Sequence, residues 1–547
     1  MNDRAETPVD HLIYSADWRN WRDPEVPDWL HPVEHLLGRH LAAGRGDRVA
    51  LHTEAGPVTY AALDRQVAQF AGVLAGVGAN PGERLLLFAT DSVEFVGIWL
   101  GAIRAGIIPV VVSDLYKAGD LHYFLTDTGA TTLFIDAEQL DKLGAAGALP
   151  PTLRRVIVRG PAPAGREGAP PIHALDDLLG QHAPAAEHWT WHANDICYMF
   201  YSGGTTGRAK GITHLAHDFW LIPARQTAFW SYRPEDVVYA TSRKYFTHGL
   251  WPGVLIPLAA GAALILDRRP LDAGLVCDLV ARHRVTKLIT VPTILKMLIN
   301  HARGAGTPPD FGSVSLVISA SEKISPEIFE DFHHLFGTEI LDSIGSSEVT
   351  YEWIANRPEE MKRGSLGKPV FGCEIRLVDS AGRDVTEPGI AGEAWVRSRT
   401  ACLFYWRKHD QTRRTFIGDW VRTGDNLRFD EDGFFWFAGR EDDVFKVKGL
   451  WVSPLEIEAA VAAHPAVYEA AVVSTAGAQG LTAARCFLVL HDPVADEAAL
   501  FDELRALVRP LGGYKVPSEF RIVPRLPRTT LSKIDRRHLR THPDYAG

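Results

Sequence analysis

The sequence predicts an α/β fold with a large N-terminal α/β domain and a small C-terminal α+β domain. The chain has 547 residues, which is too long for one ordinary hydrophobic core. From about residue 30 to residue 440, short β-branched runs alternate with amphipathic stretches, as in layers built on largely parallel sheets. From about residue 441 the pattern becomes compact α+β. Domains at residues 1–440 and 441–547 are therefore predicted.

Short apolar runs give the expected strands of the first domain. They lie at residues 84–88, 131–135, 155–158, 263–266, 287–291 and 316–319. The apolar stretch 95–112 is long, but Arg104, Pro109 and two glycines interrupt it. It is predicted to be a buried helix followed by a strand at 107–112, not a membrane span.

Two helix starts are marked by serine followed by proline. Ser325 is expected to cap a helix that begins at Pro326 and ends before Gly337. A strand is predicted at 338–341, so the residues after Leu341 should emerge where open α/β sheets bind ligands.

The second helix start lies in the C-terminal domain. Ser453 and Glu456 form the pattern of a capping box at the start of a helix over 454–463. Strands at 468–473 and 484–490 and a helix near 497–508 are predicted to follow.

The composition narrows the function classes. Hydrophobic residues make up 46%, the net charge is -10 and the pI is about 6.1, so no electrostatic feature favours nucleic acid. The five cysteines are far apart and form no CxxC pair, which argues against a disulfide scaffold or a zinc site. The first ten residues carry no apolar secretion signal. We expect a cytoplasmic protein with no membrane partner.

The strongest chemical signal is the glycine-rich run 201–211, which follows a strand-like segment at 196–201. Its glycines allow a tight turn that directs backbone N–H groups to one point, and its hydroxyls and lysine suit a polyphosphate. The spacing is not that of a Walker A loop, and an ordinary solvent-exposed turn is the alternative. The expected phosphate contacts are Ser202, Gly203, Gly204, Thr205, Thr206, Gly207 and Lys210.

Four further segments follow in a fixed order: 346–348, 422–425, 439–443 and 526–534. Together with the loop, they resemble the motifs of the ANL adenylate-forming superfamily, which includes acyl-CoA synthetases, adenylation domains and luciferases. The resemblance covers nearly the whole chain and implies stacked sheets in the large domain and a mobile small domain. Residues 243–250, 342–348 and 447–454 resemble benzoate-type aryl-CoA ligases in particular.

The resemblance assigns roles at the nucleotide end. Glu348 is expected to hold Mg²⁺, Asp425 and Arg440 the ribose, and Lys533 to bridge the acid carboxylate and the α-phosphate. Asp442 takes the hinge position, and the pantetheine passage of coenzyme A is implied at Gly449. The other nucleotide-binding positions carried over are Ala320, Ser321, Glu322, Asp342, Ser343, Ile344 and Ser347.

Two departures surround the catalytic lysine. Ser532 stands where the family usually has Gly, and Leu531 stands where it usually has Thr. Lys533 itself is retained, so adenylation is expected.

The acid pocket is expected to be lined by Phe246, Thr247, His248, Gly249, Gly345, Val349 and Tyr351. Aromatic and small apolar groups suit a flat or cyclic acid. No Asp occurs at 245–248, which argues against an amino acid substrate. Thr247, His248 and Tyr351 depart from the benzoate ligases, and Glu352 is an unusual charge nearby. These changes would admit a hydroxylated, amino-substituted or larger polycyclic acid. His248 either bonds the substrate or is a packing residue.

The predicted function is ATP-dependent activation of a carboxylic acid to an acyl-AMP, followed by thioester formation with coenzyme A. ATP, Mg²⁺ and coenzyme A are the expected cofactors, and a monomer or homodimer is the expected assembly. One alternative is a stand-alone adenylating enzyme that loads an acyl carrier protein or passes the adenylate to a partner. Another is a nucleotide-binding regulator without turnover, motivated by the changes at Leu531 and Ser532.

Overall fold

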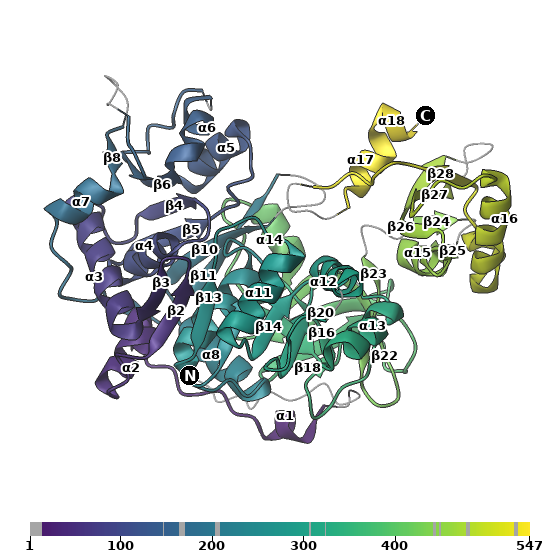
Figure 1. The fold of residues 1–547 in the computed structure, drawn as a ribbon, viewed down its shortest axis with the longest axis horizontal. Coiled ribbons are helices and arrows are strands. Elements are labelled where there is room, and N and C mark those ends of the chain that lie inside the picture. The colour runs from purple at the N-terminus through teal and green to yellow at the C-terminus, as the bar shows by residue number, and fades with distance from the viewer. Residues whose placement is uncertain are drawn as a thin grey trace. The chain divides into compact units, whose positions relative to one another are not determined.

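The computed structural model describes residues 12, 14–145, 147–163, 170–202, 208–305, 308–322, 324–440, 445–447, 450–476, 482–529 and 534–546. The chain divides into two compact units (Figure 1). Unit 1 comprises 1–202, 209–375 and 396–421, and unit 2 comprises 203–208, 376–395 and 422–547. The functional boundary expected after residue 440 stays a prediction.

Unit 1 contains a seven-stranded sheet, and two of its strands lie on either side of the glycine-rich loop in the sequence. Its strands run parallel except for β11, which pairs antiparallel with β10. The strand order is β11 (Lys210–Leu215), β10 (Ile196–Ser202), β5 (Ile108–Val111), β4 (Arg84–Phe88), β6 (Thr132–Asp136), β7 (Arg155–Arg159) and β8 (Ile172–Ala174).

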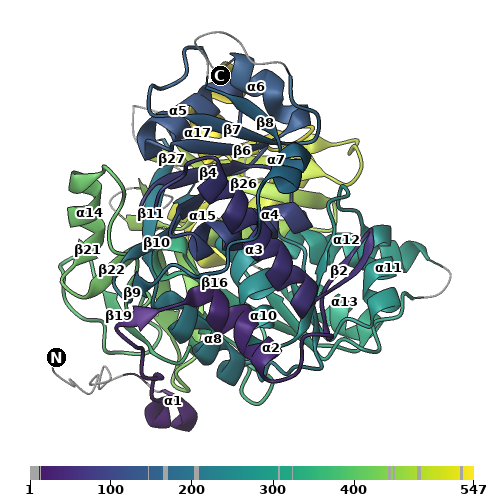
Figure 2. The ribbon, with the colours of Figure 1, turned by 90° about the vertical axis from the view of Figure 1, so that its left-hand side faces the viewer.

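The apolar stretch 95–112 is buried in this layer. It forms helix α4 (Val93–Arg104), which packs on α3 (Tyr60–Gly76) (Figure 2), and then strand β5. Every residue from Phe95 to Arg104 is buried, which confirms the predicted helix and strand. No helix in the described part of the chain is long and apolar enough to cross a membrane.

A nine-stranded sheet forms the second layer of unit 1. Helices α11 (Ala273–His283), α12 (Pro292–Gly304) and α13 (Pro326–Phe336) share one hydrophobic core cluster with it. The strand order is β18 (Lys368–Pro369), β17 (Glu352–Ala355), β16 (Ile340–Gly345), β15 (Leu316–Ser319), β14 (Lys287–Thr290), β12 (Val237–Ala240), β13 (Ala263–Leu266), β2 (Val49–Thr53) and β3 (Gly56–Thr59).

Short elements complete unit 1. In both units together, the five cysteines are buried and form no disulfide bond. The elements are α1 (Ala16–Asn20), β1 (Trp29–Leu30), α2 (Arg39–Ala42), α5 (Ala118–Thr128), α6 (Leu140–Ala145), α7 (Leu175–Gln181), β9 (Trp191–His192), α8 (Asp218–Phe229), α9 (Thr247–Leu250), α10 (Ile256–Ala260) and α14 (His409–Thr415).

The local signals located most elements correctly. The six apolar runs predicted to be strands of the first domain all form strands, and their bounds lie within one residue of those predicted. Helix α13 begins at Pro326, and Gly337 ends it with a φ of 72°, a left-handed conformation that glycine adopts without strain. Ser325 occupies the N-cap position but forms no side-chain capping hydrogen bond.

Strand β16 differs from its prediction. It was expected at 338–341 but spans Ile340–Gly345. The cause is β17, which pairs antiparallel with it and opposes Ser343 to Ala355 and Gly345 to Glu352. Asp342, Ser343 and Ile344 are therefore strand residues, and the chain leaves the sheet at Ser346.

The structure also contains a five-stranded sheet. Its strands are β19 (Cys373–Val378), β20 (Gly392–Ser398), β22 (Trp420–Phe429) and β21 (Phe416–Ile417), with β23 (Phe435–Arg440) paired to β22. The C-terminal part of unit 2 has its own core cluster. It contains β24 (Phe445–Val447), β25 (Leu450–Val452), α15 (Pro454–Ala462), β26 (Val467–Ala476), β27 (Thr482–Leu490), α16 (Glu497–Val508), β28 (Glu519–Ile522), α17 (Arg536–Thr541) and α18 (Pro543–Ala546).

The helices and strands predicted after residue 454 form, but the capping box does not. The Ser453 hydroxyl donates to the Ala438 carbonyl over 3.0 Å, and no side-chain cap bond forms at the helix start. The Glu456 carboxylate instead forms an ion pair with Lys515. Tertiary partners thus outcompete the local pairing.

Candidate active site

Glu348 lies at the centre of a polar cluster in unit 1. It sits in the 3₁₀ turn Ser347–Val349, directly after β16. The Tyr405 hydroxyl donates to Glu348 Oε1 over 2.8 Å. The Lys210 ammonium lies 4.8 Å from the centre of the Tyr405 ring, within cation–π range. One carboxylate, one phenol and one lysine thus meet at the edge of two sheets.

Tyr405 holds its proton firmly. Burial raises the pKa of its hydroxyl, and the negative charge of Glu348 raises that pKa further. At neutral pH the hydroxyl therefore remains a hydrogen-bond donor to the carboxylate. Sequence reasoning missed Tyr405, because no motif marks it and it lies 57 residues from Glu348 along the chain.

The backbone of the Glu348 turn is held on both sides. The Cys402 N–H donates to the Glu348 carbonyl over 2.7 Å. His214 Nε2 donates to the Ser347 carbonyl over 2.9 Å. The His214 side chain is fully buried, so this contact is shielded from solvent. The turn is fixed before any ligand arrives.

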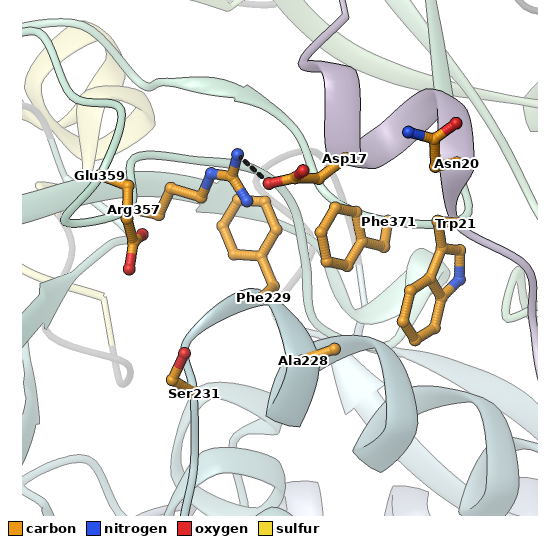
Figure 3. A pocket seen from close by; sticks show the side chains of 9 residues that line it. All are labelled: Asp17, Asn20, Trp21, Ala228, Phe229, Ser231, Arg357, Glu359 and Phe371. Atoms are coloured by element: carbon orange, nitrogen blue, oxygen red, sulfur yellow. Dashed lines mark hydrogen bonds and ion pairs between the residues drawn. The ribbon is translucent and has the colours of Figure 1, made fainter.

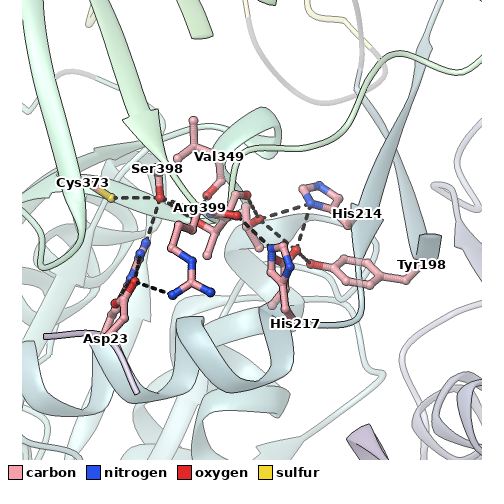
Figure 4. A network of polar contacts seen from close by, with 12 residues as sticks. Asp23, Tyr198, His214, His217, Val349, Cys373, Ser398 and Arg399 are labelled. Atoms are coloured by element: carbon pink, nitrogen blue, oxygen red, sulfur yellow. Dashed lines mark hydrogen bonds and ion pairs between the residues drawn. The ribbon is translucent and has the colours of Figure 1, made fainter. Parts of the chain in front are cut away.

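A buried polar network continues behind this turn (Figure 4). Tyr198 donates to Asp218 Oδ2 over 2.7 Å, and His214 Nδ1 lies 3.3 Å from the same oxygen. Thr350 Oγ1 donates to the Thr400 carbonyl over 2.8 Å. Thr350 is fully buried and has a φ of 82°, which is strained for a β-branched residue. Strain held by several hydrogen bonds is typical of functional sites.

The described ends of the glycine-rich loop lie together. Ser202 ends β10 and is paired directly with Lys210 at the start of β11, so the loop connects two antiparallel strands. The residues of the loop itself, Gly203, Gly204, Thr205, Thr206 and Gly207, lie outside the described residues, as do Asp442, Gly449 and Lys533.

The residues expected around adenine gather at one sheet edge. Strands β15 and β16 run parallel and align Ser319 with Asp342, so residues 320–322 and 342–344 emerge side by side. The Ser343 hydroxyl donates to the Ser319 carbonyl over 3.0 Å. Ser321 has a φ of 78°, a second strained position at this edge.

Unit 2 brings together the two residues expected at the ribose. Asp425 and Arg440 oppose each other across β22 and β23. Arg440 Nη1 donates to Asp425 Oδ1 over 3.0 Å. The turn before Asp425 is set by Gly424, whose φ is 71°.

The residues expected around the acid converge in unit 1. His248 Nδ1 lies 3.1 Å from Glu352 Oε1, and its ring centre lies 5.9 Å from that of Tyr351. The hydroxyls of Thr247 and Ser347 lie 3.4 Å apart. Val349 and Tyr351 are buried, and Phe246 precedes α9.

Two glycines of this group are required by backbone packing. A Cβ at Gly249 would lie 2.0 Å from the Arg243 carbonyl oxygen. A Cβ at Gly345 would lie 2.6 Å from the Tyr351 carbonyl oxygen. Both contacts are far inside van der Waals range, so any side chain would displace the strands or helix there.

A separate cavity of about 450 Å³ lies elsewhere in unit 1 (Figure 3). The Trp21 and Phe371 rings stack in its wall, and the Arg357 guanidinium lies 5.6 Å from the Phe229 ring centre. It contains none of the residues predicted from the sequence to act in a site.

Comparison with known protein families identifies the family of this chain. The sequence profile of the AMP-binding enzyme family matches residues 39–406. The chain belongs to this family. The profile of the AMP-binding enzyme C-terminal domain matches residues 456–533. The predicted resemblance to the adenylate-forming superfamily is thereby confirmed.

Characterised relatives extend over almost the full chain. A 4-hydroxybenzoate–CoA/benzoate–CoA ligase of Rhodopseudomonas palustris is 34% identical over 92% of this chain and 93% of its own. A benzoate–CoA ligase of Thauera aromatica is 33% identical over 94% of this chain and 97% of its own.

Solved structures agree with the fold. The anthranilate CoA ligase AuaEII, crystallised with anthranoyl-AMP, matches with a TM-score of 0.85 and 31% identity over 94% of this chain and 97% of its own. A benzoate CoA ligase of Burkholderia xenovorans LB400 matches with a TM-score of 0.82 and 30% identity over 94% of this chain and 100% of its own. The predicted α/β fold with a small C-terminal α+β part is confirmed.

Proposed function

We propose that this enzyme activates an aromatic carboxylic acid with ATP and transfers the acyl group to coenzyme A. The observation that carries the proposal is the cluster of Glu348, Tyr405 and Lys210 in a member of the AMP-binding family. The relatives named above are benzoate and hydroxybenzoate ligases, and one solved neighbour binds an aryl adenylate.

In the first half-reaction, an oxygen of the acid carboxylate attacks the α-phosphorus of ATP. The bond from the α-phosphorus to the bridging oxygen breaks, and pyrophosphate leaves. Negative charge grows on the phosphate oxygens, so fixed cations lower the barrier. Lys210 supplies one such charge at the start of β11, and Lys533 is proposed to bridge the two reacting anions.

The donor set around Glu348 fits Mg²⁺. Mg²⁺ favours one or two carboxylates together with phosphate oxygens and water. Glu348 offers one partly exposed carboxylate, and among the described residues no group of three or more His, Cys, Asp or Glu side chains is arranged to hold a metal ion by itself. The bound ion would neutralise charge on the polyphosphate. Tyr405 would orient the carboxylate by its hydrogen bond.

In the second half-reaction, the thiol of coenzyme A attacks the acyl carbon and AMP leaves. We propose that the part after residue 440 turns about Asp442 between the two steps, so that Lys533 withdraws and Gly449 borders the pantetheine passage. Asp425 and Arg440 are proposed to hold the ribose, and residues 320–322 and 342–344 the adenine. Buried cysteines that form no disulfide bond support a reducing cytoplasmic setting. A monomer or homodimer is the proposed assembly.

The test is acid-dependent ATP–pyrophosphate exchange followed by detection of acyl-CoA and AMP. Lys533→Ala should lower exchange by about 10²–10³-fold, the usual loss for one transition-state contact. Arg537→Ala, an exposed basic residue of the same tail, is the matched control and should leave exchange unchanged. Exchange without acid, or release of ADP, would contradict the proposal.

The acceptor is tested separately. Transfer to the pantetheine of an acyl carrier protein but not to coenzyme A would favour the stand-alone adenylating enzyme. Absence of exchange with every acid would favour the regulator without turnover.

A further inference from the structure

Glu352 is a buried residue, and only one of its two carboxyl oxygens has a hydrogen-bond partner among the described residues. The residue is 4% exposed and begins β17, opposite Gly345 of β16. Its Oε1 lies 3.1 Å from His248 Nδ1. Its Oε2 is buried and has no hydrogen-bond partner among the described residues. A buried acceptor without a donor costs about 1–3 kcal/mol, and more for a charged group.

His248 is the hydrogen-bond partner of the other carboxyl oxygen, Oε1. Its Nε2 lies 3.1 Å from the Thr290 carbonyl oxygen, while its Nδ1 faces Glu352. The Thr290 carbonyl oxygen can only accept, so Nε2 donates to it, and one proton is shared between Nδ1 and Glu352 Oε1. On either of these two atoms, that proton leaves Oε2 an acceptor. Oε2 therefore lacks a hydrogen-bond donor.

The free oxygen lies beside residues expected to line the acid pocket. A Cβ placed on Gly345 would come within 2.7 Å of Glu352 Oε2. Any residue other than glycine at this position would therefore displace the oxygen. The adjacent Tyr351 hydroxyl and the Ser346 hydroxyl are also buried without partners in the described structure. Three unsatisfied polar groups from one strand pair and its connecting turn are more than a packed core normally contains.

We propose that Glu352 selects an aromatic acid carrying a hydrogen-bond donor on its ring, an amino or hydroxyl group, which donates to Oε2. This inference rests on the proposed function. Within the reaction, Glu352 affects the choice of substrate and takes no part in bond making. An unsubstituted ring would leave Oε2 unpaired, and a ring methoxy group would place an acceptor against it.

The donor-bearing acid should be strongly preferred. A site whose buried polar group is left unpaired by the wrong substrate loses about 1–3 kcal/mol, roughly 5- to 150-fold in kcat/KM. The experiment measures kcat/KM by ATP–pyrophosphate exchange with benzoate and with its 2-, 3- and 4-amino, hydroxy and methoxy isomers. At least one amino or hydroxy isomer should exceed benzoate and its methoxy counterpart by at least about 5-fold.

Glu352→Gln tests the residue directly. The amide keeps the shape but presents an N–H₂ group, so the preference for the donor over the methoxy isomer should fall about 10-fold or invert. Benzoate turnover and the melting temperature show whether the variant is folded. Glu359→Gln, an isosteric change at an exposed position of the following loop, should keep the wild-type ranking.

Several results would overturn the inference. These are equal use of methoxy and donor isomers, an unchanged ranking in Glu352→Gln, or a non-aromatic acid as the best substrate. A crystal structure with the preferred acid and only water beside Oε2 would also overturn it. Exchange with some acid in these cases would leave the proposed function standing. No exchange with any acid would defeat the proposed function, and this inference with it.

Discussion

Glu348 and Glu352 lie four positions apart in the chain but in opposite environments. Glu348 is partly exposed in a turn, and its carboxylate meets the hydroxyl of Tyr405. Glu352 is buried in a strand, and its carboxylate is paired with His248. A partly hydrated carboxylate can exchange water for an arriving metal ion. A buried one must already have its counter-charge, because desolvating an unpaired ion is prohibitive.

The two carboxylates are expected to differ in their effects on activity and on stability. Changes at Glu348 should affect catalysis and leave folding nearly unaltered. Changes at the His248–Glu352 pair should affect folding and substrate choice.

His248→Ala should lower the free energy of unfolding by about 3–5 kcal/mol, because it leaves Glu352 buried and unpaired. Urea titration measures the loss. The double variant His248→Leu/Glu352→Leu removes both charges and should recover most of that stability. A single variant as stable as the wild type would show that the pair is not buried as described.

Glu348→Gln should lower adenylation by about 10²–10³-fold, with every acid affected alike. Its stability should stay within about 1 kcal/mol of the wild type, since the side chain is only partly buried. Exchange rates across a Mg²⁺ titration and a urea titration give both values. If Glu348→Gln lost stability but kept its exchange rate, Glu348 would be a structural residue and the proposed difference from Glu352 would be wrong.

Tyr405→Phe removes the hydrogen bond to Glu348 and keeps the ring beside Lys210. A hydrogen bond to a charged group is worth about 1.5–3 kcal/mol, so exchange should fall by roughly 10- to 100-fold. Tyr468→Phe, at an exposed tyrosine, is the control. Equal rates in Tyr405→Phe and the wild type would exclude an orienting role.

Alkaline pH should destabilise the wild type more than Tyr405→Phe. In the unfolded chain this tyrosine ionises near pH 10, whereas burial and Glu348 keep its pKa higher in the folded state. The folded state therefore holds the extra proton, and its stability falls as pH rises above about 10. The slopes of unfolding free energy should differ by up to about 1.4 kcal/mol per pH unit. Identical slopes would contradict the raised pKa.

Arg440→Ala in unit 2 should change stability least. Its side chain is 41% exposed, and such ion pairs contribute about 0–1 kcal/mol. The expected signature is a higher KM for ATP with little change in melting temperature. An unchanged KM would argue against a ribose contact.

Local sequence determined where most elements lie. Apolar runs, a proline at the first helical position and a glycine after the last are short-range signals, which is why α13 begins and ends as predicted. The motif residues Glu348 and His248 were recognisable for the same reason. Family membership also followed from ordered motifs rather than from tertiary contacts.

Which side chains meet depends on how the chain packs in three dimensions. Tyr405 reaches Glu348 across 57 residues, and His248 reaches Glu352 across 104. Strand β16 continues to Gly345 because β17 folds back on it, and Ser453 leaves its capping role for a carbonyl 15 residues away. Such partners are chosen by packing and by the need to satisfy buried polar groups, and neither is encoded in a short window of sequence.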